Sequence, residues 1–142
     1  MPKSLRILLA EDEETDVLLL RHALRRAGLT HELVVAQDGK EAIEYLSGRA
    51  RGEDHPQCPM PALIVLDLKM PRMTGFDVLI WLQSQPDLKQ LPALVLTSSD
   101  DAADKLRAQQ LGAVDYLVKP DSLRGLVTVV QELQGKWLDR PD

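Results

Sequence analysis

One stretch of the sequence, LIVLDLKMPRMTG (residues 63–75), constrains the fold more than any other. Its first four residues are all aliphatic, which is typical of a strand buried on both faces of a parallel sheet. A single acid, Asp67, ends this run, and Pro71 and Gly75 follow in a segment with turn chemistry. Open α/β sheets bind their ligands at the carboxyl ends of the strands, so Asp67 is a candidate functional residue.

Strand-like and helix-like segments alternate along the whole chain. Five short runs rich in aliphatic residues are the expected strands: Arg6–Ala10, Glu32–Ala36, Ala62–Leu66, Ala93–Thr97 and Asp115–Val118. Each is followed by a stretch with apolar residues at helical spacing. This order predicts an α/β fold, namely a single doubly wound domain with a five-stranded parallel sheet and five flanking helices.

The expected helices have recognisable ends. Gly28 is placed to cap the first helix, Asp38 to begin the second and Gly48 to end it, while Ser99 or Asp100 begins the fourth. The apolar positions expected on the third, fourth and fifth helices are Phe76, Leu79, Ile80, Leu82, Leu106, Leu111, Leu123, Leu126, Val130 and Leu133.

Composition excludes several classes of protein. A net charge of -5 disfavours nucleic-acid binding, and no apolar run is long enough for a signal peptide or a membrane span. The lone Cys58 rules out an internal disulfide and suits a reducing compartment. We therefore expect a soluble cytoplasmic domain without an effector domain. The charged, proline-rich segment Arg49–Pro61 is expected to be a solvated surface loop.

Polar residues stand at the ends of four expected strands. Glu11 and Asp12 follow the first, Asp67 follows the third, Thr97 ends the fourth and Lys119 follows the fifth. Because the carboxyl ends of parallel strands share one edge, these side chains should meet in a shallow pocket. Clustered carboxylates repel one another unless a cation joins them, and their hard oxygens suit Mg²⁺. Such a site can receive a phosphoryl group on one carboxylate.

Four motifs carry a family resemblance: ILLAEDEETD, LIVLDLKMPRMTGFDVL, ALVLTSSD and GAVDYLVKP. In this order they resemble the receiver domain of two-component response regulators over nearly the whole chain. The resemblance implies the strand order 2-1-3-4-5. It also implies that Asp67 accepts a phosphoryl group from a sensor histidine kinase. Asp12, Asp67 and the backbone carbonyl of Lys69 would bind Mg²⁺, with Glu11 acting through water.

The resemblance implies further roles around the phosphoacceptor. Lys119 would pair with a phosphoryl oxygen and join Pro120 through a cis peptide bond. Thr97 would move its hydroxyl toward the phosphate, and Tyr116 would change rotamer behind it. The output face would be formed by the fourth helix, fifth strand and fifth helix. A chain of this kind catalyses only its own phosphotransfer and slow autodephosphorylation, so it is not expected to be an enzyme for external substrates.

Two residues beside the site depart from the common pattern of this family. Lys69 is expected to reach a phosphoryl oxygen with its ammonium group, exclude the attacking water and prolong the phosphorylated state. Ser98 carries a hydroxymethyl group where many relatives have Ala or Gly, and it is expected to narrow access to Asp67 slightly.

Two features indicate partners. The long connection after the second helix and the YLSG motif at Tyr45–Gly48 resemble stand-alone regulators that partner bacterial phytochromes. Val129, Trp137 and Leu138 fall off the apolar stripe of the last helix, which predicts a homodimer through the face of the fourth and fifth helices. The alternative is that Trp137 folds back onto its own sheet.

Other functions fit less well. A phosphatase of the haloacid dehalogenase type needs a second Asp two residues after its nucleophile, where Lys69 would be a poor proton donor. A flavin phosphate would be repelled by Glu11–Glu14, and no phosphate-binding GxxxxGK[ST] motif is present. The remaining alternative is a receiver-like interaction module that works without phosphorylation.

Overall fold

Five parallel strands form the centre of the structure, a computed structural model that describes residues 6–50 and 60–138. The strands are β1 (Arg6–Ala10), β2 (Glu32–Ala36), β3 (Leu63–Leu66), β4 (Ala93–Thr97) and β5 (Tyr116–Val118). They are ordered β2-β1-β3-β4-β5, and each neighbouring pair is parallel. The predicted fold class and strand order are therefore confirmed.

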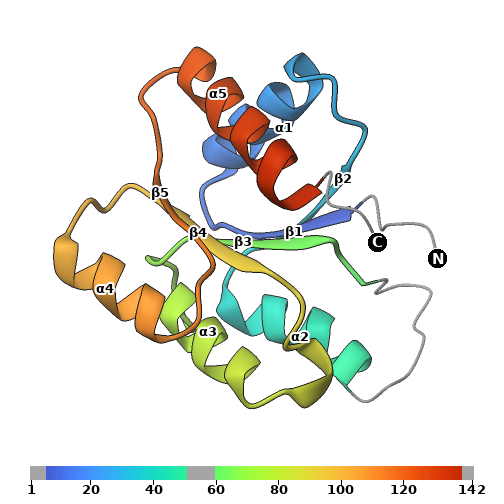
Figure 1. Cartoon of the computed structure of the whole chain (residues 1–142), viewed down its shortest axis with the longest axis vertical. Helices are drawn as coiled ribbons and strands as arrows, with labels where there is room; N and C mark the ends of the chain where they lie inside the picture. Colours follow the sequence, from blue (N-terminus) through green and yellow to red (C-terminus); the bar gives the residue numbers. More distant parts are fainter. Residues whose placement is uncertain (1–5, 51–59, 139–142) are drawn as a thin grey trace.

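Helices cover both faces of this sheet (Figure 1). The helices are α1 (Glu14–Arg26), α2 (Gly39–Ala50), α3 (Gly75–Gln83), α4 (Ala102–Gln110) and α5 (Leu123–Leu133). A 3₁₀ turn, η1 (Pro86–Leu88), precedes β4, and a π-helical segment, η2 (Gln134–Leu138), continues α5. In Figure 1, α1 and α5 lie on one face, and α2, α3 and α4 lie on the other. Each layer therefore encloses its own apolar core, as the two separate clusters of buried side chains show.

The aliphatic run of β3 is buried on both sides, as its lack of polar alternation predicts. Leu63 and Val65 face the core under α1 and α5, whereas Ile64 and Leu66 face the core over α2 and α3. All four are at most 1% exposed. Burying a side chain of this size contributes about 1.5–3 kcal/mol, so β3 fixes the centre of the sheet and the position of Asp67 after it.

Several boundaries differ from those predicted. β3 and β5 each begin one residue later, at Leu63 and Tyr116. The helix α2 runs past Gly48 to Ala50, because a glycine inside a helix costs only about 1 kcal/mol and does not have to end it. The helix α4 begins at Ala102 rather than after Ser99 or Asp100, because the Asp101 carboxylate accepts the Ala103 N–H and caps it.

Not every apolar position of the third and fourth helices is buried. Ile80 and Leu106 lie on α3 and α4 as expected, but they are 46% and 56% exposed. Ala108 is the only residue of α4 that is buried, so this helix contributes little to the apolar core. Conversely, Leu138 is 4% exposed, and Trp137 and Val129 pack against the core under α1 and α5. The three residues that predicted a homodimer therefore contribute to the chain's own core, and the alternative for Trp137 is the correct one.

Most of the segment predicted to be a solvated loop, Arg49–Pro61, lies outside the described residues. Among the described residues, no helix has both the length and the apolar character needed to cross a bilayer.

Candidate functional site

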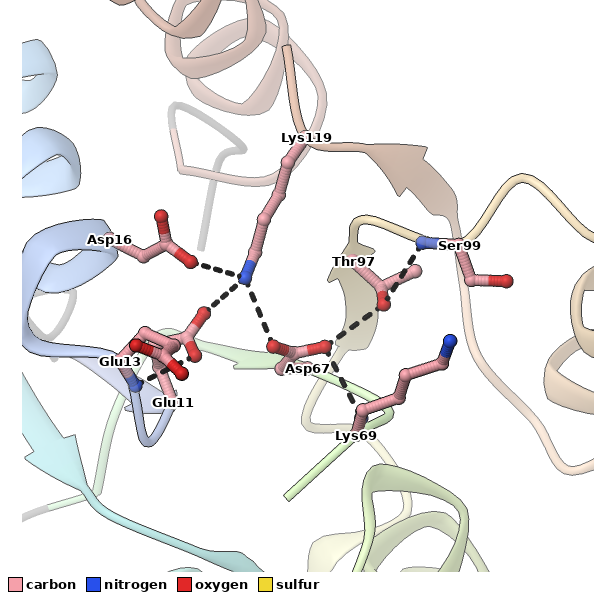
Figure 2. A network of polar contacts seen from close by, with 8 residues as sticks. All are labelled: Glu11, Glu13, Asp16, Asp67, Lys69, Thr97, Ser99 and Lys119. Atoms are coloured by element: carbon pink, nitrogen blue, oxygen red, sulfur yellow. Dashed lines mark hydrogen bonds and ion pairs between the residues drawn. The ribbon is translucent and has the colours of Figure 1, made fainter. Parts of the chain in front are cut away.

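The side chains predicted to converge do meet at the carboxyl edge of the sheet (Figure 2). Glu11 directly follows β1, Asp67 follows β3, Thr97 ends β4 and Lys119 follows β5. The backbone supports this arrangement, since the N–H of Asp67 donates to Ala10 O at 3.0 Å. Four segments that are far apart in the sequence thus contribute to one polar cluster.

Lys119 is the positive centre of the cluster. Its Nζ lies 2.5 Å from Glu11 Oε1, 2.8 Å from Asp16 Oδ2 and 3.0 Å from Asp67 Oδ2. Figure 2 shows the Lys119 side chain reaching in from the segment after β5, with Glu11 and Asp16 on one side and Asp67 on the other. An ammonium group has three donors, so each carboxylate can accept one hydrogen bond.

The second oxygen of Asp67 is held by a buried hydroxyl. Thr97 Oγ1, which is 0% exposed, donates to Asp67 Oδ1 at 2.9 Å, and the backbone N–H of Lys69 donates to the same oxygen at 3.3 Å. Gly75 packs directly on this backbone, since a Cβ there would lie 2.3 Å from the Asp67 carbonyl oxygen. Only glycine fits at this position without moving the acceptor segment.

Three carboxylates of the cluster form a candidate cation site. Glu11, Asp12 and Asp67 each offer an oxygen, and these oxygens lie within 4.8 Å of one another. Opposite ligands of an octahedral Mg²⁺ ion are about 4.2 Å apart, so the spacing suits one ion held by some of these oxygens directly and by others through water. Glu11 and Asp67 are buried, whereas Asp12 is exposed to solvent. The donor set therefore fits a hard divalent cation.

Burial changes the proton affinity of the cluster. Desolvation raises the pKa of Glu11 to about 7, and the negative charge of Asp67 adds to this effect, while the hydrogen bond from Lys119 opposes it. Burial alone would lower the pKa of Lys119, but its hydrogen bonds to Asp16, Glu11 and Asp67 outweigh burial and raise it. Lys119 is consequently charged at every physiological pH.

Tyr116 and Ser99 connect the site to α4. The Tyr116 side chain is buried, and its hydroxyl donates to the backbone carbonyl of Ser99 at 2.8 Å. The Ser99 N–H lies 3.5 Å from Thr97 Oγ1, and the Ser99 hydroxyl donates to Asp104 Oδ2 in α4. A chain of contacts thus runs from Asp67 through Thr97 and Ser99 to both Tyr116 and α4.

The remaining predicted site residues are placed as follows. The Lys69 side chain is exposed and extends away from Asp67 in Figure 2, and its contact with Asp67 is made by the backbone N–H. Ser98 is exposed. The predicted cis bond between Lys119 and Pro120 is wrong, since no described peptide bond is cis. The trans form is favoured by about 0.5–1 kcal/mol even before proline, and Lys119 reaches its three partners from it.

Sequence reasoning missed Asp16. This residue lies in the first turn of α1, four positions before the buried Leu20, so it shares the face that α1 turns toward the sheet. That spacing, together with its closeness to the end of β1, is a signal that could have identified it.

A second missed feature fixes the segment after Asp67. Arg72 has a positive φ of 64°, and its Nε lies 2.6 Å from Oδ2 of the buried Asp38. Desolvation would raise the pKa of Asp38, but hydrogen bonds from the Glu41 N–H and from Arg72 lower it below its usual range. The Gly39 N–H also donates to Met73 O at 2.8 Å. The start of α2 therefore clamps the loop that leads from Asp67 to α3.

Comparisons with known proteins agree with this geometry. The family model for the response regulator receiver domain matches residues 7–131. Response regulator Rcp1 of Synechocystis sp. is 35% identical over 94% of this chain and 88% of its own length. The phosphorylated cyanobacterial phytochrome response regulator RcpA superposes with a TM-score of 0.84 at 32% identity, covering 99% of this chain and 98% of that one. The Mn²⁺-bound form of Rcp1 superposes with a TM-score of 0.82 at 34% identity and the same coverage.

Proposed function

Because the chain belongs to the response regulator receiver domain family, we propose that it accepts a phosphoryl group on Asp67 in a Mg²⁺-dependent reaction. The observation that carries the proposal is the joint approach of Lys119 Nζ and Thr97 Oγ1 to the two oxygens of Asp67. The nucleophilic carboxylate of Asp67 thus lies beside a positively charged ammonium group and a hydroxyl donor. Phosphoryl transfer depends on this kind of positioning and charge neutralisation.

The chain's own residues account for the chemistry of the transfer. A carboxylate oxygen of Asp67 forms a bond to phosphorus while the bond from phosphorus to the donor breaks, and the leaving group keeps the electron pair. Asp12, Asp67 and the Lys69 carbonyl would hold Mg²⁺, with Glu11 acting through water. When bound, the ion neutralises negative charge on the phosphoryl oxygens. Lys119 supplies a further positive charge, and Thr97 supplies a hydrogen-bond donor.

The contacts behind Asp67 support a role as a switch. A phosphoryl group adds a charge of about -2 at neutral pH. This charge would attract the ammonium group of Lys119 and strengthen hydrogen bonding by the Thr97 hydroxyl. Thr97 is linked through Ser99 to Tyr116 and to Asp104 in α4. Phosphorylation can therefore bias the arrangement of the face formed by α4, β5 and α5 between two states.

We propose a sensor histidine kinase of the bacterial phytochrome type as the phosphodonor in the cytoplasm. The support is the similarity to Rcp1 and to the phytochrome response regulator RcpA along nearly the whole chain. Phosphotransfer from a phosphorylated phytochrome kinase should be at least about tenfold faster than from an unrelated kinase, equivalent to about 1.4 kcal/mol in the barrier. Equal rates from both kinases would contradict this choice of donor.

The face of α4, β5 and α5 remains the proposed surface for partners, including a second copy of the chain. Because Trp137 packs against the core of its own chain, it does not support this surface. The support comes from the exposed apolar side chains of Leu106 and Val118. Light scattering with and without beryllofluoride tests the homodimer, and a monomeric mass in both conditions would dismiss it. We propose no catalysis on external substrates beyond the chain's own phosphotransfer and slow dephosphorylation.

A phosphorylation-independent interaction module is the alternative function. It predicts that Asp67→Ala captures the same partners as the wild type when acetyl phosphate is present. The proposed function predicts that capture depends on Asp67 and on the phosphodonor.

A further inference from the structure

The ammonium group of Lys119 at the centre of the site contacts three carboxylates, and its contact with the phosphoacceptor is the longest. The distance from Lys119 Nζ is 2.5 Å to Glu11, 2.8 Å to Asp16 and 3.0 Å to Asp67. The two shorter contacts are made to Glu11 and Asp16, on the side of the site formed by the end of β1 and by α1 (Figure 2).

Asp16 differs from the other two acceptors in its surroundings. Its side chain is 35% exposed, compared with 3% for Glu11 and 7% for Asp67. It also lies outside the trio of carboxylates, Glu11, Asp12 and Asp67, whose oxygens are close enough to share a cation. Asp16 can therefore pair with Lys119 without occupying a position that the cation or the phosphoryl group needs.

A divalent cation and Lys119 compete for the same carboxylate. Both are positive and both approach Asp67, so the ammonium group and a bound cation repel each other there. With Asp16 present, Lys119 keeps an anionic partner on α1 when its contact with Asp67 loosens. Of the three described carboxylates that contact Lys119, Glu11 and Asp67 remain when Asp16 is removed, and both belong to the cation site.

We propose that Asp16 is a positioning residue that holds Lys119 toward α1 and thereby keeps Asp67 available to the divalent cation. The inference deepens the proposed function and rests on it, since the cation matters only for phosphoryl transfer to Asp67. Asp16 acts through Lys119 and does not touch the phosphoryl group or the ion.

Calorimetric titration of the unphosphorylated full chain with Mg²⁺ tests the inference. Asp16→Asn should raise the Kd for Mg²⁺ about three- to tenfold, as expected from a stronger competing charge at a partly buried site. The matched control is Glu14→Gln, which removes the same charge from the first turn of the same helix. Glu14 is exposed and is not one of the three partners of Lys119, so its Kd should change less than about twofold.

A double-mutant cycle separates positioning from simple loss of charge. In a Lys119→Gln background the competition is gone, and adding Asp16→Asn should change the Kd no more than adding Glu14→Gln. Asp16→Ser provides a second way to remove the carboxylate if the Asn variant unfolds, since serine is tolerated at the start of a helix.

Two outcomes would overturn the inference: equal effects of Asp16→Asn and Glu14→Gln in the wild type, or an undiminished effect of Asp16→Asn without Lys119. Because the titration contains no phosphodonor, failure of phosphorylation at Asp67 is a separate result. A chain that binds Mg²⁺ as predicted but accepts no phosphoryl group would contradict the proposed function alone.

Discussion

Thr97 Oγ1 donates a hydrogen bond to Asp67 Oδ1 at 2.9 Å, and both side chains are buried. Thr97→Val keeps the shape of the side chain but removes this donor and the acceptor that faces the Ser99 N–H. We expect a loss of about 1–3 kcal/mol in the free energy of unfolding, measured by urea denaturation. The control Thr128→Val, at an exposed position of α5, should change it by less than about 0.5 kcal/mol. Equal losses in the two variants would contradict a structural role for the Thr97 hydroxyl.

The Glu11 carboxyl makes stability depend on pH. Its pKa is raised by burial to about 7 in the folded chain, against about 4.3 in an unfolded one. A raised pKa contributes stability below the unfolded value and loses it as the pH rises through the folded value. Without metal, Glu11→Gln should therefore be more stable than the wild type by roughly 1–3 kcal/mol at pH 8, and this advantage should fall to about a third of that near pH 5.

Thermal unfolding in a chelating buffer at the two pH values checks this prediction. Glu132→Gln, an exposed change in α5, serves as the control and should show no such difference. An advantage of Glu11→Gln that stays constant between pH 5 and pH 8 would show that Glu11 does not titrate in this range.

The clamp between Arg72 and Asp38 has the opposite pH dependence. The lowered pKa of Asp38 contributes stability above its unfolded value of about 3.9 and loses it as the pH falls through the folded value. Asp38→Asn keeps a side chain that can cap α2 but removes the charge, so we expect about 1–2 kcal/mol less stability at pH 7. Below pH 4 the difference from the wild type should shrink. A difference that persists unchanged in acid would contradict the ion pair.

Arg72→Asn tests the same clamp from its other side. Asparagine tolerates the left-handed backbone of this position, where φ is 64°, so the loop can keep its conformation while the guanidinium is lost. Combined with Asp38→Asn, it should add little further destabilisation, because both changes remove one interaction. Fully additive losses in urea denaturation would show that the two residues act separately.

Mg²⁺ should stabilise the folded chain through the carboxylates of Glu11, Asp12 and Asp67. At a concentration of one hundred times the Kd, the expected gain in stability is about 2.7 kcal/mol, seen as a rise in Tm. Asp12→Asn should lose most of this gain. Asp87→Asn, an exposed acid in η1, should keep it. A similar rise in both variants would mean that the ion binds elsewhere.

Much of the site could be predicted from the order of strands alone. The aliphatic run of β3 identified a central strand, and the acid after it had to lie at the carboxyl edge. The same reasoning placed Glu11 and Lys119, because each follows its own parallel strand directly. Positions set by the backbone of the sheet are therefore readable from periodicity and turn chemistry.

The residues that sequence reasoning missed are placed by how side chains from helices and loops extend into the site, and the order of strands does not reveal this. Asp16 enters the site from the first turn of α1, and Arg72 pairs with Asp38 from a left-handed backbone conformation that the sequence does not reveal. Apolar spacing likewise could not show that Leu138 returns to the core, because that depends on the π-helical turn after α5. Such details come from packing between elements.

Phosphorylation of Asp67 is the central claim, and intact-protein mass spectrometry tests it most directly. After incubation with acetyl phosphate and Mg²⁺, the wild type should gain the mass of one phosphoryl group. Asp67→Asn should gain none, and omission of Mg²⁺ should abolish the gain in the wild type. An unmodified wild-type chain, or an adduct that persists in Asp67→Asn, would contradict the account.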